Sequence, residues 1–127
     1  MKPNEFNNEI DVVYKEMILD LYRNPLNKGT LPNPDFEHRE VNPTCGDDIT
    51  IAIHFDGNEV QEIMHDGVGC AISQASVSLL TDYIKGKTKE EIKAITKDDA
   101  LELLQIPISH TRLKCALLGW KVLQSLT

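Results

Sequence analysis

The stretch ITIAIHFDGNEVQEIMHD, residues 49–66, decides the fold of this chain. Its first half places Ile49, Ile51, Ile53 and Phe55 at every second position, the alternation that is typical of a half-buried strand. Asp56-Gly57-Asn58 is a strong signal for a tight turn between antiparallel strands, and Val60–Asp66 returns as the partner strand. The stretch therefore predicts a β-hairpin at the centre of the protein.

Helical patterns follow the hairpin. Residues 71–86 have apolar side chains at helical spacing and end at a glycine; the apolar positions are Ile72, Ala75, Leu79 and Tyr83. Thr88 and Glu91 have capping-box spacing and begin a short helix over 89–95, and residues 98–104 predict another. The last helix is expected over 110–126. It has one apolar stripe through Leu113, Ala116, Leu117, Trp120 and Leu123, and a second through Cys115, Leu118, Val122 and Leu126.

Before the hairpin, residues 5–22 predict a helix, with apolar positions at Phe6, Ile10, Val13, Tyr14, Met17, Ile18 and Leu21. Asn24-Pro25 ends it, an extended prolyl connector follows, and residues 37–42 predict a short strand. The expected architecture is α+β, a small antiparallel three-stranded sheet flanked by helices, in a single domain over residues 1–127.

Charge and hydropathy exclude several classes of protein. The formal net charge is −7 over 127 residues, which argues against nucleic-acid binding because phosphate contacts need a basic surface. No apolar run approaches the roughly 20 residues of a membrane helix, and the N-terminus lacks the apolar core of a signal peptide. We therefore expect a cytoplasmic protein with neither nucleic acid nor membrane as a partner.

The three cysteines are the candidate functional residues, and their odd number excludes a closed disulfide framework. Free thiols in a reducing compartment leave three interpretations open: inert core packing, catalysis and metal binding. Cys115 lies in an apolar helix, where an inert buried thiol is the commoner case. Cys45 lies in a polar turn, Pro-Thr-Cys-Gly-Asp, which favours chemistry over packing. Cys70, in Gly-Val-Gly-Cys, falls between the two.

The hairpin brings two of these cysteines together. Cys45 precedes the first strand and Cys70 follows the second, so the far ends of the hairpin predict that they are neighbours. The start of a helix after Cys70 favours a thiolate there. With Cys115 supplied by the last helix and Asp47 as the nearest oxygen donor, the set fits a tetrahedral zinc site.

The histidines are alternative ligands. His54 lies on the polar face of its strand, and for both His54 and His65 a solvent-facing position is the favoured prediction, although His65 is close to Cys70. His110 lies five residues before Cys115, on the wrong helical face for joint ligation.

Four segments together resemble the U-type iron–sulfur cluster assembly proteins, a family that includes IscU, SufU and the N-terminal domain of NifU. The segments are LYRNPLNKG (21–29), NPTCGDDI (42–49), DGVGCAISQASVSLLTDYIKGKT (66–88) and RLKCALLGW (112–120). The resemblance covers essentially the whole chain and implies the SufE/IscU-like fold. Lys114 stands where IscU members have a histidine, which is similar to SufU.

The resemblance to SufU implies a sulfur carrier, sulfurtransferase-like rather than a stand-alone enzyme. Such a protein takes persulfide sulfur from a cysteine desulfurase and passes it to downstream cluster assembly or acceptor proteins. By motif position Cys45, Asp47, Cys70 and Cys115 would bind Zn²⁺, Cys45 would accept the sulfur, and Arg112 would stabilise a thiolate or the partner's persulfide.

Two alternatives remain open at this stage. One is a scaffold that assembles a [2Fe–2S] cluster on Cys45, Cys70 and Cys115; the other is a structural zinc domain that serves only protein contact. The segment from Cys70 to Cys115 is shorter than in SufU members and closer to the IscU pattern, which implies a different desulfurase contact.

Overall fold

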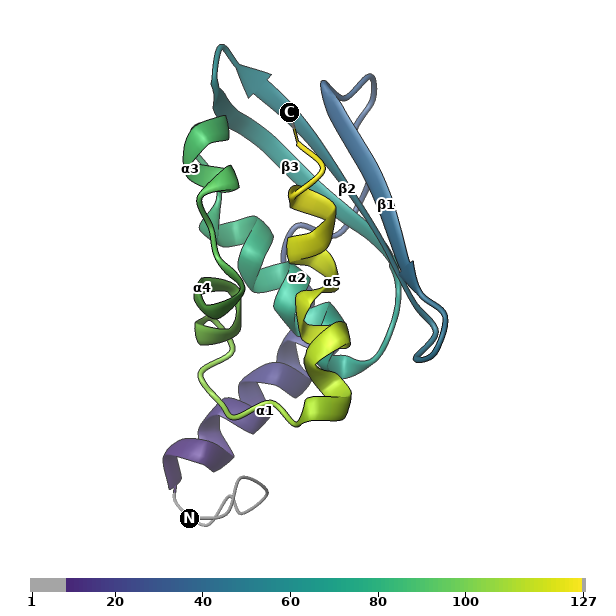
Figure 1. Ribbon diagram of the computed structural model, residues 1–127, viewed down its shortest axis with the longest axis vertical. Coiled ribbons are helices and arrows are strands. Elements are labelled where there is room, and N and C mark those ends of the chain that lie inside the picture. The colour runs from purple at the N-terminus through teal and green to yellow at the C-terminus, as the bar shows by residue number, and fades with distance from the viewer. Residues whose placement is uncertain (1–8, 127) are drawn as a thin grey trace.

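The computed structural model describes residues 9–126, with side chains from Lys15 onward. Its centre is a three-stranded antiparallel sheet in the order β1-β2-β3, formed by β1 (Phe36–Asn42), β2 (Asp47–Asp56) and β3 (Glu59–Val68) (Figure 1). The hairpin register pairs Ile51 with His65 and Asp56 with Glu59. The α+β class and the antiparallel sheet are therefore confirmed.

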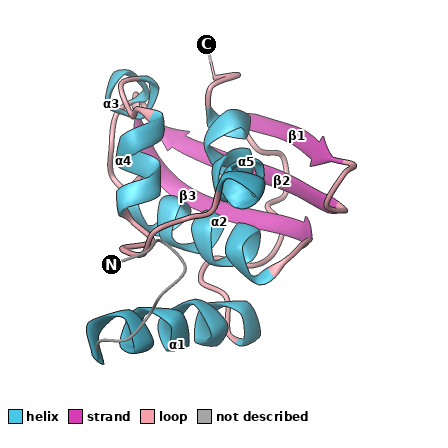
Figure 2. Cartoon of the chain, turned by 60° about the horizontal axis from the view of Figure 1, so that its bottom comes forward, coloured by secondary structure: helices cyan, strands magenta, loops and turns pink. Residues whose placement is uncertain are grey.

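The described residues also form five α-helices and one short 3-10 helix. They are α1 (Glu9–Arg23), α2 (Ala71–Tyr83), α3 (Lys89–Lys93), α4 (Lys97–Glu102), η1 (His110–Arg112) and α5 (Leu113–Leu123). In Figure 2, α2 and α5 lie over one face of the sheet, and α1 packs against α2. No helix of the described residues is long and apolar enough to cross a membrane.

The core lies between the sheet and the pair α2 and α5. Ile49, Ile51 and Ile53 are all fully buried, as the alternation predicts. Asp47 has the same parity on β2 and is also buried, at 1% exposure, so the core-facing row of the strand ends in a carboxylate. This row leads from the apolar interior to the turn that carries Cys45.

The predicted helix starts and ends differ at several places. The helix predicted over 71–86 ends at Tyr83. Tyr83, predicted on the apolar face, is 46% exposed, and the neighbouring Ile84 is buried instead. Residues 110–112 form η1, so α5 begins only at Leu113. The capping box of Thr88 and Glu91 is confirmed.

The buried face of α5 also differs from the main predicted stripe. The buried residues follow the second apolar line together with part of the first, because α5 packs on both α2 and the sheet: Cys115, Ala116, Leu118, Gly119, Val122 and Leu123. In the N-terminal helix Ile18 and Leu21 are buried as predicted. The predicted apolar positions Phe6, Ile10, Val13 and Tyr14 lie outside the residues whose side chains are described.

The prolyl connector is fastened to the free edge of β3. The amide of His65 donates to the Asn27 carbonyl (2.8 Å), and the amide of Gly29 donates to the His65 carbonyl (2.9 Å). The His65 ring is 1% exposed, and its Nε2 lies 2.7 Å from the Leu26 carbonyl oxygen. The prediction that His65 faces solvent is therefore wrong: its strand position faces α2, and the connector covers it.

His54 is also less exposed than predicted. Its side chain is 22% exposed, and Nε2 lies 2.8 Å from the carbonyl oxygen of Pro32 in the same connector. Both histidines thus hold the connector against the sheet.

Burial of His65 makes the stability of the fold depend on pH. Desolvation lowers the pKa of His65 from its ordinary 6.5. The hydrogen bond to the Leu26 carbonyl raises the pKa, but by less, so the pKa is lowered in the folded protein. The unfolded chain then binds a proton more readily than the folded one, so the free energy of unfolding declines as pH falls below the ordinary value. We expect the urea midpoint of the wild type to decrease between about pH 7.5 and about pH 5.5 more steeply than that of His65→Gln.

The control is His110→Gln, which removes an exposed histidine and should leave the pH dependence of the urea midpoint as in the wild type. Equal pH slopes for the wild type and His65→Gln would contradict this account of His65.

Candidate metal centre

The turn between β1 and β2 presents Cys45 to solvent. Asn42 pairs with Asp47 across the two strands, and the four residues between them form the loop. The loop is closed by the Cys45 amide, which donates to the Asn42 carbonyl at 3.2 Å, and Gly46 takes the left-handed conformation with φ +73°. Cys45 is exposed at the tip of this loop, as the polar turn sequence suggests.

Cys70 lies beside the same turn because the strands of the hairpin pair to their ends. Asp48 is opposite Val68, and Cys70 follows two residues later as the N-cap of α2. The backbone amide of Cys70 donates to Asp47 Oδ1 at 2.9 Å. A side chain at position 67 would collide with the Asp48 carbonyl, and the backbone there has φ +127°. Glycine at this position therefore lets β3 lie close to β2.

Cys115 approaches from α5 and is fully buried. The Asn42 side-chain amide lies 4.0 Å from its Sγ, within reach of an N–H···S contact. Burial raises the pKa of the Cys115 thiol well above its ordinary range, and the neighbouring Asp47 carboxylate and the other two cysteines add to the rise.

Three of the four predicted ligands converge on one point. The ligand atoms of Cys45, Asp47 and Cys115 all lie within 4.8 Å of one another. Cys70 is not part of this mutually close set. Its amide donates a hydrogen bond to Asp47, and its thiol is near enough to Cys115 to contribute to the raised pKa of that thiol. The assignment of all four as zinc ligands stays a prediction.

The Asp47 carboxylate supplies the test of whether a cation fits. Its Oδ1 accepts hydrogen bonds from the Cys70 amide and from Ser73 Oγ, whereas Oδ2 is buried and has no hydrogen-bond partner. A buried carboxylate oxygen without a partner is costly, and a divalent cation is the partner that two thiolates and a carboxylate would share. The donor set of sulfur and oxygen atoms suits zinc.

The remaining predicted residues lie around this centre. Arg112 is exposed in η1, three residues before Cys115, and Lys114 is exposed in the first turn of α5. The cluster contains no histidine: His110 is exposed in η1, and His65 faces the connector. Sequence reasoning missed Ser73 and Asn42, which contact the ligands; the position of Asn42 three residues before the turn cysteine was the available signal.

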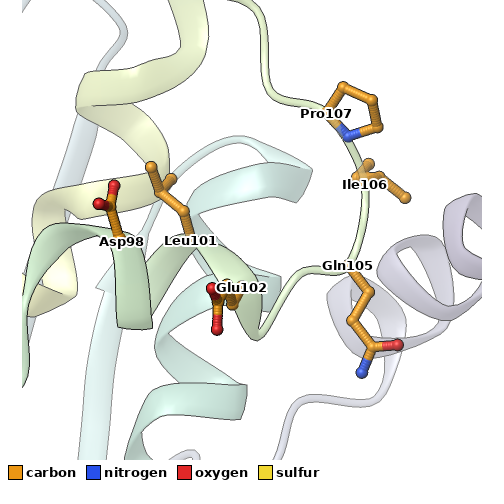
Figure 3. A pocket seen from close by; sticks show the side chains of 6 residues that line it. All are labelled: Asp98, Leu101, Glu102, Gln105, Ile106 and Pro107. Carbon is orange, nitrogen blue, oxygen red and sulfur yellow. The ribbon is translucent and has the colours of Figure 1, made fainter.

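A surface pocket lies apart from these residues in sequence. Its walls come from α4 and the loop after it, namely Asp98, Leu101, Glu102, Gln105, Ile106 and Pro107 (Figure 3). None of the predicted ligands lines it, so the candidate centre is the thiol cluster and not the pocket.

The sequence and the fold are similar to those of known proteins. The sequence profile of the NifU-like N terminal domain matches residues 13–126. The zinc-dependent sulfurtransferase SufU of Bacillus subtilis (strain 168) is 38% identical, over 94% of this chain and 92% of that protein. The iron-sulfur cluster assembly scaffold protein IscU of Escherichia coli (strain K12) is 32% identical, over 85% of this chain and 86% of that protein.

A solved structure is similar as well. The crystal structure of a putative iron-sulfur cluster assembly scaffold protein for the SUF system, from Fervidobacterium islandicum AW-1, superposes with a TM-score of 0.78 at 28% sequence identity. The superposition covers 91% of this chain and 96% of that chain.

Because Asp47 Oδ2 has no hydrogen-bond partner, we expect a substitution of Asp47 to stabilise the metal-free protein, whereas most substitutions of buried residues destabilise. Asp47→Asn keeps an acceptor for the Cys70 amide and removes a buried negative charge, so the metal-free protein should gain about 1 kcal/mol in unfolding free energy. Urea denaturation in the presence of a chelator measures this, and zinc affinity should fall in the same variant.

Asp48→Asn is the matched control. That neighbouring carboxylate is paired with Arg39 at 2.6 Å, so its loss should bring no gain in stability. If Asp47→Asn destabilises the metal-free protein as an ordinary buried polar mutation would, Asp47 is structural and the metal interpretation of Oδ2 is wrong.

Proposed function

Because the chain belongs to the family of NifU-like N-terminal domains, which act in iron–sulfur cluster assembly, we propose that it is a zinc-binding sulfur acceptor. It would take persulfide sulfur from a cysteine desulfurase and pass it to downstream assembly or acceptor proteins. We also propose that residues 1–127 form one domain of this family. The cytoplasmic location expected from the sequence stays a prediction.

The single observation that supports this proposal is the contrast in exposure within one cluster. Cys45 is exposed, Cys70 is half-buried, and Cys115 and Asp47 are buried, yet the ligand atoms of three of them lie within 4.8 Å of one another. A purely structural zinc site has no need of an exposed thiol on a short turn. A sulfur acceptor does, because a partner's persulfide must reach its nucleophile.

Cys45, Asp47, Cys70 and Cys115 are the residues that would hold the metal. When bound, zinc keeps coordinating thiols ionised at neutral pH and adds no redox chemistry of its own. The buried ligands are anchored by this chain's own groups: the Cys70 amide and Ser73 hold Asp47, and Asn42 lies against Cys115.

The transfer itself is a thiolate exchange at sulfur. The Cys45 thiolate attacks the terminal sulfur of the partner's persulfide, a new S–S bond forms on Cys45, and the partner's own S–S bond breaks. The partner's cysteine leaves as a thiolate, so electrons balance without an external oxidant or reductant. Arg112, exposed in the turn before α5, offers a guanidinium for the departing thiolate or the incoming persulfide.

The second candidate function is a scaffold on which a [2Fe–2S] cluster is built as cargo on Cys45, Cys70 and Cys115. The IscU relatives and the short segment from Cys70 to Cys115 support it. We prefer sulfur transfer because of the 38% identity to SufU and because Lys114 stands at the position of the IscU histidine. Anaerobic reconstitution with iron, sulfide and a desulfurase separates the two, since a stable, fully occupied, transferable cluster would favour the scaffold.

The first test of the proposal joins metal content to sulfur transfer. Protein purified without chelator should contain about one zinc per chain. On incubation with a desulfurase and cysteine, mass spectrometry should find one added sulfur atom on Cys45, and Cys45→Ala should accept none. Protein that holds no zinc and never carries a persulfide would rule the proposal out.

Arg112 provides a second test with a neighbouring control. Arg112→Ala should slow sulfur acceptance roughly tenfold or more, the effect of losing one charge-assisted hydrogen bond, while zinc content stays unchanged. Lys114→Ala removes an exposed cation two residues away and should transfer at the rate of the wild type. Equal rates for both variants would remove Arg112 from the mechanism.

A further inference from the structure

The carboxylate of Asp47 is held asymmetrically. Oδ1 accepts two hydrogen bonds, from the Cys70 amide at 2.9 Å and from Ser73 Oγ at 3.2 Å. Oδ2, on the same carbon, is buried and accepts none. Since a carboxylate oxygen has about two lone-pair sites, Oδ1 is saturated and only Oδ2 is available to a cation.

Ser73 is built into this arrangement. It is the third residue of α2 and is fully buried, and its hydroxyl lies within reach of two acceptors, Asp47 Oδ1 and the Cys70 carbonyl at 3.0 Å. Its single proton has the stronger partner in the charged carboxylate. Asp47 without Ser73 would keep only one of the two bonds that set its side-chain rotation.

Gly69 leaves the space in which this contact forms. A Cβ at position 69 would lie 2.7 Å from Asp47 Oδ1 and would collide with Ser73 Oγ. Glycine at position 69 therefore lets the start of α2 lie close to Asp47.

We propose that Ser73 is a positioning residue that fixes the rotation of the Asp47 side chain, so that Oδ2 is the oxygen that would hold the metal. This inference rests on the proposed function. Without the Ser73 bond the carboxylate would be free to rotate, and its hold on the metal would be weaker.

The experiment compares Ser73→Ala with Ser76→Ala. Both remove a buried hydroxyl from α2, but Ser76 donates to the Ala116 carbonyl at 2.6 Å and makes no described hydrogen bond to a predicted ligand. Zinc affinity is measured by competition with a chromophoric chelator, and the urea midpoint of the metal-free protein reports the cost to the fold. We expect affinity to fall about tenfold in Ser73→Ala and to stay within about twofold of the wild type in Ser76→Ala.

A double-mutant cycle with Asp47→Ala shows whether Ser73 acts through Asp47. In the Asp47→Ala background, Ser73→Ala should cost no further zinc affinity. A persistent loss there, or equal losses in Ser73→Ala and Ser76→Ala, would overturn the inference, as would wild-type affinity in Ser73→Ala. A wild-type protein that binds no zinc would overturn the proposed function itself, which keeps the two failures distinct.

Discussion

A buried carboxylate at the end of β2 is the constraint on which the structure of the site depends. Asp47 continues the core-facing row of Ile49, Ile51 and Ile53, so the strand directs it into the interior. There its Oδ1 accepts a hydrogen bond from the Cys70 amide, and this bond connects the end of the sheet to the start of α2. The other oxygen, Oδ2, is buried and has no hydrogen-bond partner. Because such an oxygen is costly to bury, this end of the fold is the candidate site for a cation.

The three cysteines differ in how each is held, and this difference separates a transfer site from a structural one. Cys115 is enclosed by the packing of α5, and Cys70 is fixed at a helix N-terminus. Cys45 is on a four-residue loop whose only described backbone anchor is one bond to Asn42. Cys45 is therefore the least constrained of the candidate ligands.

The connector shows that residues far from the chemistry shape the same region. It follows the edge of β3 and buries His65, and Lys28 donates to the Gly67 carbonyl at 2.7 Å, in the strand end that leads to Cys70. Periodicity could not reveal this contact, because a loop has no repeat and its partner strand is chosen only when the chain folds. The prediction that His65 faces solvent failed for that reason.

The sequence alone determined the elements and the candidate ligands. Alternation and turn residues specified the hairpin, a capping box began α3, and residue type singled out Cys45, Cys70, Cys115 and Asp47, because these are local properties of the chain. Tertiary structure decided which face of α5 is buried, that His65 is covered by the connector, and that Ser73 and Asn42 reach the ligands. Those outcomes depend on how α2 and α5 pack on the sheet, and packing joins residues that no local pattern connects.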